Sequence, residues 1–269
     1  GVCGRQGKDQ RGSEVKLKTV LEANVDRDQD YRNKTTVLLK KLIQYIKGKG
    51  LKAFEHTNIS KVNALTIPLV KVDREYEQLL FGLSHFGSTK GVFVVKPGPK
   101  AGNNRDNYFQ IRLTQVLSSE DIDAIKSGDV SDEKEMVDKI IKGIKKFNTT
   151  FSHEMIHYYD WLRRGESGKK FGKKKSASKK QTQTQHAQDY INDPVELNAF
   201  AQQLFADIDK DKHLTKRMYS AFGGLDFKSF YKSEIAGRKK NVEFIEFLSP
   251  KNKKKFMVRV YQYWEKYFK

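Results

Sequence analysis

The spacing of apolar residues predicts helices in two long parts of the chain. Residues three and four positions apart share one face of an α-helix, because the helix turns once in about 3.6 residues. Residues 35–47 follow this pattern, and Gly48 and Gly50 come next as a stop signal. Residues 132–164 follow it over a longer stretch, which predicts one long helix or two helices in line. The apolar positions of this longer stretch are Met136, Ile140, Ile144, Phe147, Phe151, Met155, Tyr159 and Leu162.

Capping signals and composition predict further helices. A serine at position 118 or 119, followed by two acidic residues, indicates a short helix that ends near Gly128. The run Asn-Asp-Pro at residues 192–194 indicates the start of an amphipathic helix that continues to about Asp209, since proline is favoured at the first helical position. Residues 213–269 are rich in Phe, Tyr and Lys, and we expect several helices there.

Four segments have the character of β-strands. Apolar and polar residues alternate at positions 15–21, which indicates a first strand after a flexible, Gly-rich terminus at residues 1–14. Three more segments are rich in β-branched or aromatic residues and are bounded by Gly, Pro or Asn; they are Ala64–Val72, Gly91–Val95 and Tyr108–Leu113. Together these segments predict an α+β fold, with a small mixed sheet and a helical C-terminal part.

The amino-acid composition indicates a folded globular protein. Of the 269 residues, 37% are hydrophobic and 12% are aromatic, which is typical of a folded globular chain. No apolar run reaches the roughly 18 residues that a membrane span needs, and the first ten residues lack the apolar stretch of a signal peptide. The chain has one cysteine, Cys3, so any metal site would use histidine and carboxylate ligands. Because the first residue is Gly1 rather than Met, the chain is compatible with a processed product.

The charge of the chain is strongly positive. A formal net charge of +19 would attract nucleic acid, an anionic membrane face or an acidic protein, but it would equally keep a solvated surface soluble. The most biased stretch is residues 165–188, which we expect to form a surface loop. This loop is a candidate for binding a polyanion such as nucleic acid. Its lysines are Lys169, Lys170, Lys173, Lys174, Lys175, Lys179 and Lys180.

The second half of the predicted helix at residues 132–164 carries the run His153-Glu154-Met155-Ile156-His157. Residues four apart lie on one face of a helix, so both imidazoles can direct a nitrogen at one point. Two histidines, a third protein ligand and a water make up a catalytic zinc site, and the metal lowers the pKa of that water. Glu154 is then the general base. The alternative is a helix with two surface histidines, but the apolar neighbours favour a buried helix.

The third metal ligand has several candidates. We favour Glu196, because it lies in the first turn of a predicted helix, where a rigid element would hold its carboxylate firmly. The alternative is that Asp193 and Glu196 form a capping box and bind no metal. The full set of candidates is Glu166, His186, Asp189, Asp193 and Glu196.

Two supporting roles are open in the sequence. Asp160 lies three residues after His157 and either accepts a hydrogen bond from its imidazole or is a solvated helix residue. A tetrahedral oxyanion beside the metal would need a hydrogen-bond donor, and Tyr190 is one candidate. The other candidate donors are Tyr158, Tyr159, His186 and His213.

These residues resemble the zincin superfamily of metallopeptidases. The pair His153 and His157 with a downstream Glu196 is similar to the gluzincin-like pattern, whereas the longer metzincin pattern is absent, since neither a Gly nor a third His follows at the required spacing. The run Glu196-Leu197-Asn198-Ala199-Phe200-Ala201 also resembles the second helix of small peptidases of phages and mobile elements. The resemblance covers about residues 107–207.

The resemblance implies a zinc-dependent metallopeptidase with Zn²⁺ as cofactor and a protein or peptide as substrate. It implies an active-site helix in a zincin-like domain at residues 15–210, followed by a helical extension at residues 211–269. It also implies that Tyr108–Leu113 is an edge strand to which a substrate peptide adds as an extra strand.

A second hypothesis belongs to a different class. The lysine-rich stretch at residues 165–188 is equally typical of a basic nucleic-acid-binding or virion-associated structural protein that keeps a zincin-like fold without catalysis. We expect an intracellular location by default, cytoplasmic or virion-associated, and no membrane partner.

Overall fold

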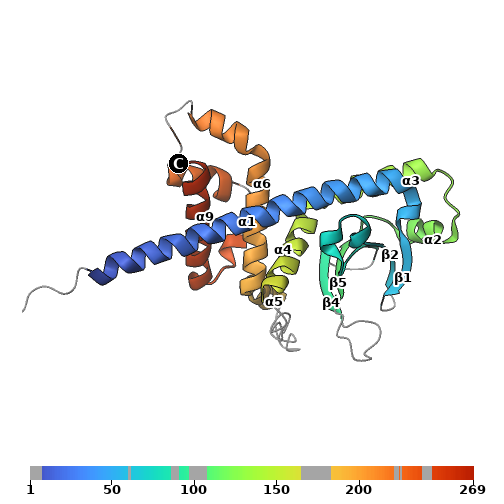
Figure 1. Cartoon of the computed structure of the whole chain (residues 1–269), viewed down its shortest axis with the longest axis horizontal. Coiled ribbons are helices and arrows are strands. Elements are labelled where there is room, and N and C mark those ends of the chain that lie inside the picture. Colours follow the sequence, from blue (N-terminus) through green and yellow to red (C-terminus); the bar gives the residue numbers. More distant parts are fainter. Residues whose placement is uncertain are drawn as a thin grey trace, which may run out of the picture. The chain divides into compact units, whose positions relative to one another are not determined.

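The structure is a computed structural model of the chain. It describes residues 8–59, 62–85, 91–96, 108–164, 183–220, 224, 226–237 and 244–269. The chain forms two compact units (Figure 1). We call residues 33–173 the sheet unit, and residues 1–32 together with 174–269 the helical unit. No helix within the described ranges is long and apolar enough to cross a membrane.

A five-stranded mixed sheet organises the sheet unit, with strand order β1-β2-β3-β5-β4. The pair β3 and β5 is parallel, and the other neighbouring strands are antiparallel. The predicted α+β class is therefore confirmed. The strands are β1 (Glu55–Ile59), β2 (Val62–Pro68), β3 (Leu79–Ser84), β4 (Gly91–Lys96) and β5 (Tyr108–Thr114).

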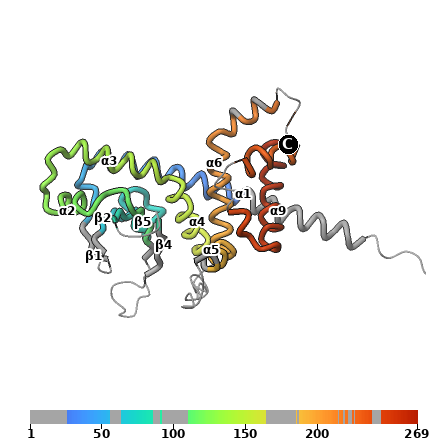
Figure 2. The backbone as a smooth tube through the Cα atoms, turned by 180° about the vertical axis from the view of Figure 1, so that it is seen from behind, coloured from blue at the N-terminus to red at the C-terminus, as the bar shows by residue number. Residues whose placement is uncertain are grey.

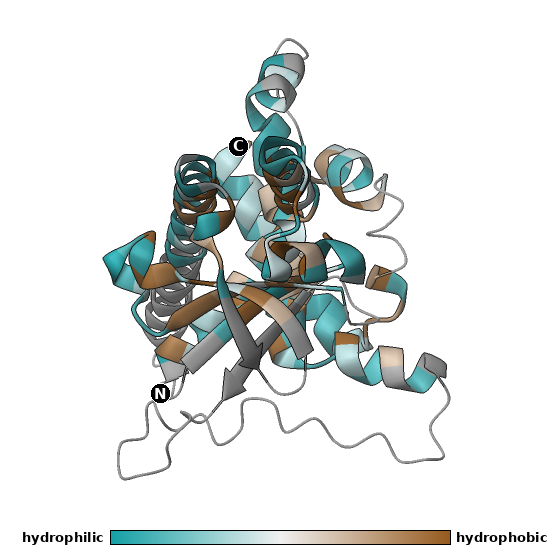
Figure 3. Cartoon of the chain, turned by 90° about the vertical axis from the view of Figure 1, so that its right-hand side faces the viewer, coloured by the Kyte–Doolittle hydropathy of each residue, from teal (hydrophilic) through white to brown (hydrophobic). Residues whose placement is uncertain are grey.

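One face of the sheet packs against α4 (Asn148–Arg164), the helix that carries the candidate site. Successive residues of a strand point to opposite faces, and the register pairs Phe81 with Ile111, so both lie on this face. The ring of Phe81 meets that of Phe151 on α4 edge to face, with 6.0 Å between centroids. All three side chains are fully buried. In Figure 3 the hydrophobic residues of the sheet are coloured brown.

Helices complete the sheet unit. The C-terminal part of α1 (Lys8–Lys49) buries Leu38, Leu42 and Ile46. The short helix α2 (Ser119–Ser127) starts with a capping box on Ser118 and ends at Gly128 in the left-handed conformation, as the sequence predicts. Residues 132–164 form two helices, α3 (Glu133–Lys146) and α4, and the chain changes direction between them at Phe147 (Figure 2).

The helical unit has its own apolar core. Its helices are α5 (Gln183–Ile191), α6 (Pro194–Ser220), the short α7 (Phe227–Phe230), the π-helical turn η5 (Tyr231–Ala236) and α9 (Pro250–Tyr267). Buried residues of α6 and α9 meet in one cluster, so these two helices share a core. The predicted functional domains at residues 15–210 and 211–269 stay a prediction.

Three predictions differ from the structure, the last two of them only in part. Residues 15–21 are not a strand but part of α1, which also includes residues 8–14 of the predicted flexible terminus. No Gly or Pro occurs between residues 14 and 47, so the local alternation stands inside a long run that favours a helix. Of the predicted loop at residues 165–188, residues 183–188 belong to α5, and residues 165–182 lie outside the described residues.

The sheet also differs from the expected one. Residues 64–72 leave the strand after Pro68, and residues 69–71 form a 3-10 turn. Tyr108–Leu113 is not an edge strand, because β4 pairs antiparallel with the outer side of β5. Strands β1 and β3 were not predicted, since β1 is polar and β3 is an apolar run without alternation.

Candidate metal centre

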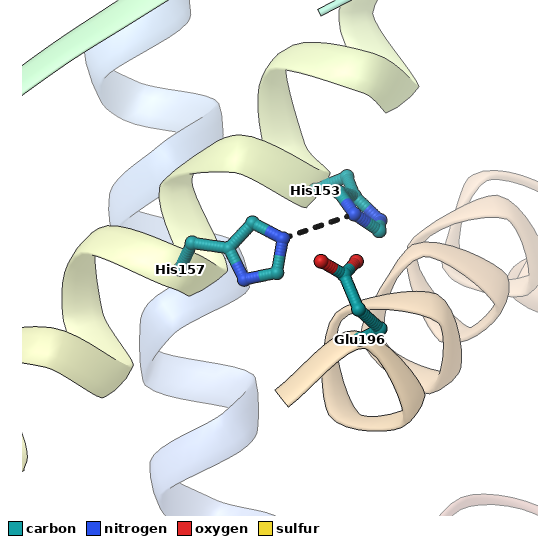
Figure 4. A group of neighbouring side chains, drawn as sticks. All are labelled: His153, His157 and Glu196. Atoms are coloured by element: carbon teal, nitrogen blue, oxygen red, sulfur yellow. Dashed lines mark hydrogen bonds between the residues drawn. The ribbon is translucent and has the colours of Figure 1, made fainter. Parts of the chain in front are cut away.

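Helix α4 places His153 and His157 on one face, one turn apart. Their Nε2 atoms lie 3.1 Å from each other, and their ring centroids are 4.8 Å apart (Figure 4). Each residue is 6% exposed, so the pair is buried. The alternative of two surface histidines is therefore excluded.

The spacing of the two nitrogens suits a shared metal ion. Two nitrogens that bind one zinc at about 2.0–2.1 Å with a tetrahedral angle lie about 3.3 Å apart. The observed separation of 3.1 Å is close to this value. The same separation also lets one neutral ring donate a hydrogen bond to the other, depending on the tautomer.

Glu196 joins the two histidines in a group with metal-ligating chemistry. One ligand atom from each of His153, His157 and Glu196 lies within 4.8 Å of the others (Figure 4). The histidines belong to the sheet unit, and Glu196 belongs to the first turn of α6 in the helical unit. Imidazole nitrogen and carboxylate oxygen are ligands that zinc accepts.

The N-terminus of α6 has a side-chain cap. The side chain of Asp193 accepts a hydrogen bond from the backbone N–H of Val195 at 2.8 Å, so Asp193 caps the helix. The backbone N–H of Asp193, which would donate to the carboxylate of Glu196 in a reciprocal capping box, donates to the carbonyl of Tyr190 at 3.1 Å. The assignment of Glu196 as a metal ligand stays a prediction.

Glu154 is buried beside the first residue of the edge strand. Its side chain is 7% exposed. A Cβ atom built on Gly91 would lie 3.2 Å from Oε1 of Glu154 and 2.3 Å from Cγ2 of Thr150. The missing side chain at Gly91 thus lets β4 approach α4 closely, and it brings the carboxylate of Glu154 next to the strand.

The sequence did not single out Gly91 or Thr150. A signal for Gly91 existed, because a glycine at a strand position often marks a close backbone approach. Thr150 carries no such signal, since its role depends on which strand lies over α4.

Asp160 is buried on α4, with 2% of its surface exposed. It forms an ion pair with Arg163, in which the nitrogen and the oxygen are 3.4 Å apart. Asp160 is therefore not a solvated helix residue. Its predicted role in orienting His157 stays a prediction.

Tyr158 and Tyr159 belong to a buried aromatic group with Tyr76. The hydroxyls of Tyr76 and Tyr159 are 2.9 Å apart and hydrogen-bonded. Burial raises the pKa of Tyr158 to about 12 and raises that of Tyr159 further. Both hydroxyls therefore stay protonated near neutral pH.

The remaining candidates differ in where they lie. Tyr190 on α5 is exposed, with its ring packed edge to face on Phe200. His213 lies 17 residues beyond Glu196 on α6, about 25 Å along the helix axis, so it is not close to that carboxylate. Asp189 is exposed on α5. The side chain of His186 and the whole of Glu166 lie outside the described residues.

Comparisons with known proteins give no family for this chain. No protein-family model, no curated protein and no solved structure matches it significantly. The geometry of the candidate metal centre is therefore the basis for inferring a function.

Proposed function

We propose that the chain is a zinc-dependent metallopeptidase that hydrolyses peptide bonds. The observation that carries this proposal is the group of His153, His157 and Glu196, whose ligand atoms lie within 4.8 Å of one another. Two imidazoles and one carboxylate form the protein ligands of many catalytic zinc sites, which keep a fourth position for water. Completion of the site by Glu196, from the helical unit, is part of the proposal.

Glu154 is the proposed general base. Bound zinc would acidify its water ligand and polarise the carbonyl group of the substrate. Glu154 lies in the same turn of α4 as the two histidines, directly after His153, so its carboxylate would accept the proton of that water and transfer it to the leaving amine. The burial of Glu154 beside Gly91 supports this role. A base in a poorly hydrated site is held in one position, and few bulk water molecules compete for its hydrogen bonds.

Strand β4 is the proposed site of substrate binding. Within the described sheet it ends the strand order, so its outer backbone groups are not paired to another described strand. A substrate peptide in extended form would pair with these groups, as in other cases of β-strand addition. The carboxylate of Glu154 lies at the beginning of this strand, so the scissile bond would be placed near Gly91.

Metal analysis tests the proposal before any substrate is known. We expect one zinc per chain in the wild-type protein after dialysis, measured by inductively coupled plasma mass spectrometry. His153→Ala, His157→Ala and Glu196→Ala should each lose most of it. His213→Ala and Glu246→Ala are matched controls, because both side chains are exposed and lie in the helical unit.

Two outcomes would contradict the proposal. Wild-type protein without zinc, even after zinc is supplied, would leave the histidine pair as a hydrogen-bonded structural feature. It would favour the second hypothesis, a basic nucleic-acid-binding or virion-associated protein without catalysis. Full zinc content in Glu196→Ala would show that Glu196 is not a metal ligand. The other candidate ligands would then have to be tested.

A further inference from the structure

The exposed face of α9 has an unusual arrangement of charge. Lysines at positions 251, 253, 254 and 255 occupy its first two turns, and all four are exposed. No acidic residue lies in the first turn. The N-terminus of a helix carries a partial positive charge, so lysines there weaken the helix by roughly 0.3–1 kcal/mol each at most. An anion bound at this face would offset that cost.

These four lysines are exposed and lie close together, within five residues. Within the described residues none of the four forms an ion pair. By contrast, Lys210 pairs with Asp207 at 2.7 Å, and Lys212 pairs with Asp209 at 3.7 Å. Lys266 and Lys269 near the end of α9 also pair with acidic residues. Single exposed lysines on α6, α7 and η5 also lack an ion pair among the described residues, but at the start of α9 four such lysines lie together.

An aromatic ring continues the same face. Lys254 and Tyr261 are seven residues apart, which is two helical turns, so they lie on one stripe about 10 Å apart along the axis. Tyr261 is 41% exposed. Its ring packs edge to face on Phe227, with 5.1 Å between centroids, and lies 5.5 Å from the ring of Trp264. The exposed ring of Tyr261 is thus fixed by its packing on these two rings.

We propose that this face of α9 binds single-stranded nucleic acid. The lysine side chains at 251, 254 and 255 would contact phosphates, and Tyr261 would stack on an unpaired base. A membrane surface fits less well, because the broad apolar face of α9 is already buried in the core of the helical unit, where Phe256, Val260 and Tyr263 pack. This site is separate from the candidate metal centre and does not depend on peptidase activity.

Fluorescence anisotropy on the full chain tests this proposal. The probe is a labelled oligothymidylate of roughly 20 nucleotides, longer than one typical binding site. The variant K251Q/K254Q/K255Q is compared with K142Q/K145Q/K146Q, which removes the same charge from exposed lysines of α3 in the sheet unit. We expect the α9 variant to bind at least about 10-fold more weakly, with a salt dependence lower by about 2 in slope. The α3 variant should change much less.

Substitution of the ring separates stacking from charge. Tyr261→Leu should weaken binding about fivefold or more, whereas Tyr261→Phe keeps the ring and should bind like the wild type. Equal losses in the two triple variants would overturn the proposal, because they would show a general effect of net charge. Absence of oligonucleotide binding by the wild type at about 50 mM salt would also overturn it. So would binding to phosphatidylserine vesicles, with the same lysine dependence, in place of the oligonucleotide.

Discussion

A buried cluster of polar side chains in the helical unit differs in its chemistry from one in the sheet unit. In the helical unit the cluster centres on Arg32, whose guanidinium donates to Asp209 at 3.0 Å and to Gln202. In the sheet unit the cluster centres on His153 and His157, which present the same kind of atom to each other. The first cluster joins complementary groups, and the second joins identical ones.

The Arg32 cluster is satisfied by groups of its own unit. Gln202 donates to Asp28 at 2.6 Å, and the hydroxyl of Tyr263 donates to Asp209 at 2.7 Å. The guanidinium of Arg32 also lies 5.7 Å from the ring centroid of Tyr263. Such a closed network of donors and acceptors needs no further component, and it specifies how α1, α6 and α9 pack.

The histidine cluster consists of identical groups. Two imidazole nitrogens that face each other in a buried position can share one proton in a hydrogen bond, or can both donate a lone pair to one metal ion. A buried polar cluster thus indicates a structural role when its charges are complementary, and a ligand-binding role when its ligand atoms are alike.

The largest expected effect is on catalysis. Glu154→Gln keeps the shape of the side chain but removes the base, so peptide hydrolysis should fall by about 100-fold or more. A quenched fluorogenic peptide library measures the rate, and metal analysis should give unchanged zinc. Undiminished hydrolysis in this variant would exclude Glu154 as the base.

The next effect is on the stability of the helical unit. Arg32→Met leaves the carboxylates of Asp28 and Asp209 without their buried partner, which should lower the free energy of unfolding by about 3–5 kcal/mol. Urea unfolding followed by circular dichroism measures this loss. Arg217→Met is the control, because Arg217 is exposed on α6, and it should change stability by less than about 0.5 kcal/mol. Similar values for the two variants would show that the cluster is not important for stability.

Zinc should stabilise one cluster and not the other. A ligand at about 100 times its Kd adds about 2.7 kcal/mol to the free energy of unfolding, so zinc should raise the Tm of the wild type. His157→Ala should lose this shift, and Arg32→Met should keep it on a lower baseline. Differential scanning fluorimetry with and without zinc gives both numbers. A zinc shift that persists in His157→Ala would mean that the metal binds elsewhere.

A smaller effect should follow at the approach of β4 to α4. Gly91→Ala places a methyl group 2.3 Å from Cγ2 of Thr150, so we expect a loss of about 1–3 kcal/mol in stability together with slower hydrolysis. Thr150→Ser removes that Cγ2 atom and should restore much of both in the double variant. Gly48→Ala is the control, because nothing lies within 4 Å of its added Cβ. No difference between the two glycine variants would refute a close approach at Gly91.

The sequence predicted the parts of the site that lie within one element. The histidine pair was predictable because it depends only on a helix at residues 148–164. The position of Glu196 was predictable because Asp193 and Pro194 are typical of a helix start. Gly91 and Thr150 were missed because their contact joins a strand to a helix 59 residues later.

Strand pairing was the least predictable part of the fold. Tyr108–Leu113 was predicted as a strand, but its place inside the sheet depends on β4, which pairs with it on the outer side. The residues of α1 were mistaken for a strand at positions 15–21, because seven residues of alternation resemble a strand when the longer helical context is ignored. The first case depends on another strand of the sheet, and the second depends on the neighbouring sequence of the same helix.

The Arg32 cluster also has a consequence for how the chain is made. Arg32 is separated by 177 residues from its partner Asp209. At roughly 5–20 residues per second, a ribosome would take about 10–35 s to reach the partner, so α1 leaves the ribosome long before its charge is neutralised. During that interval the sheet unit, which is continuous in the chain, can already fold around the C-terminal part of α1. Order of synthesis therefore favours the sheet unit as the first structure, with the helical unit closing last.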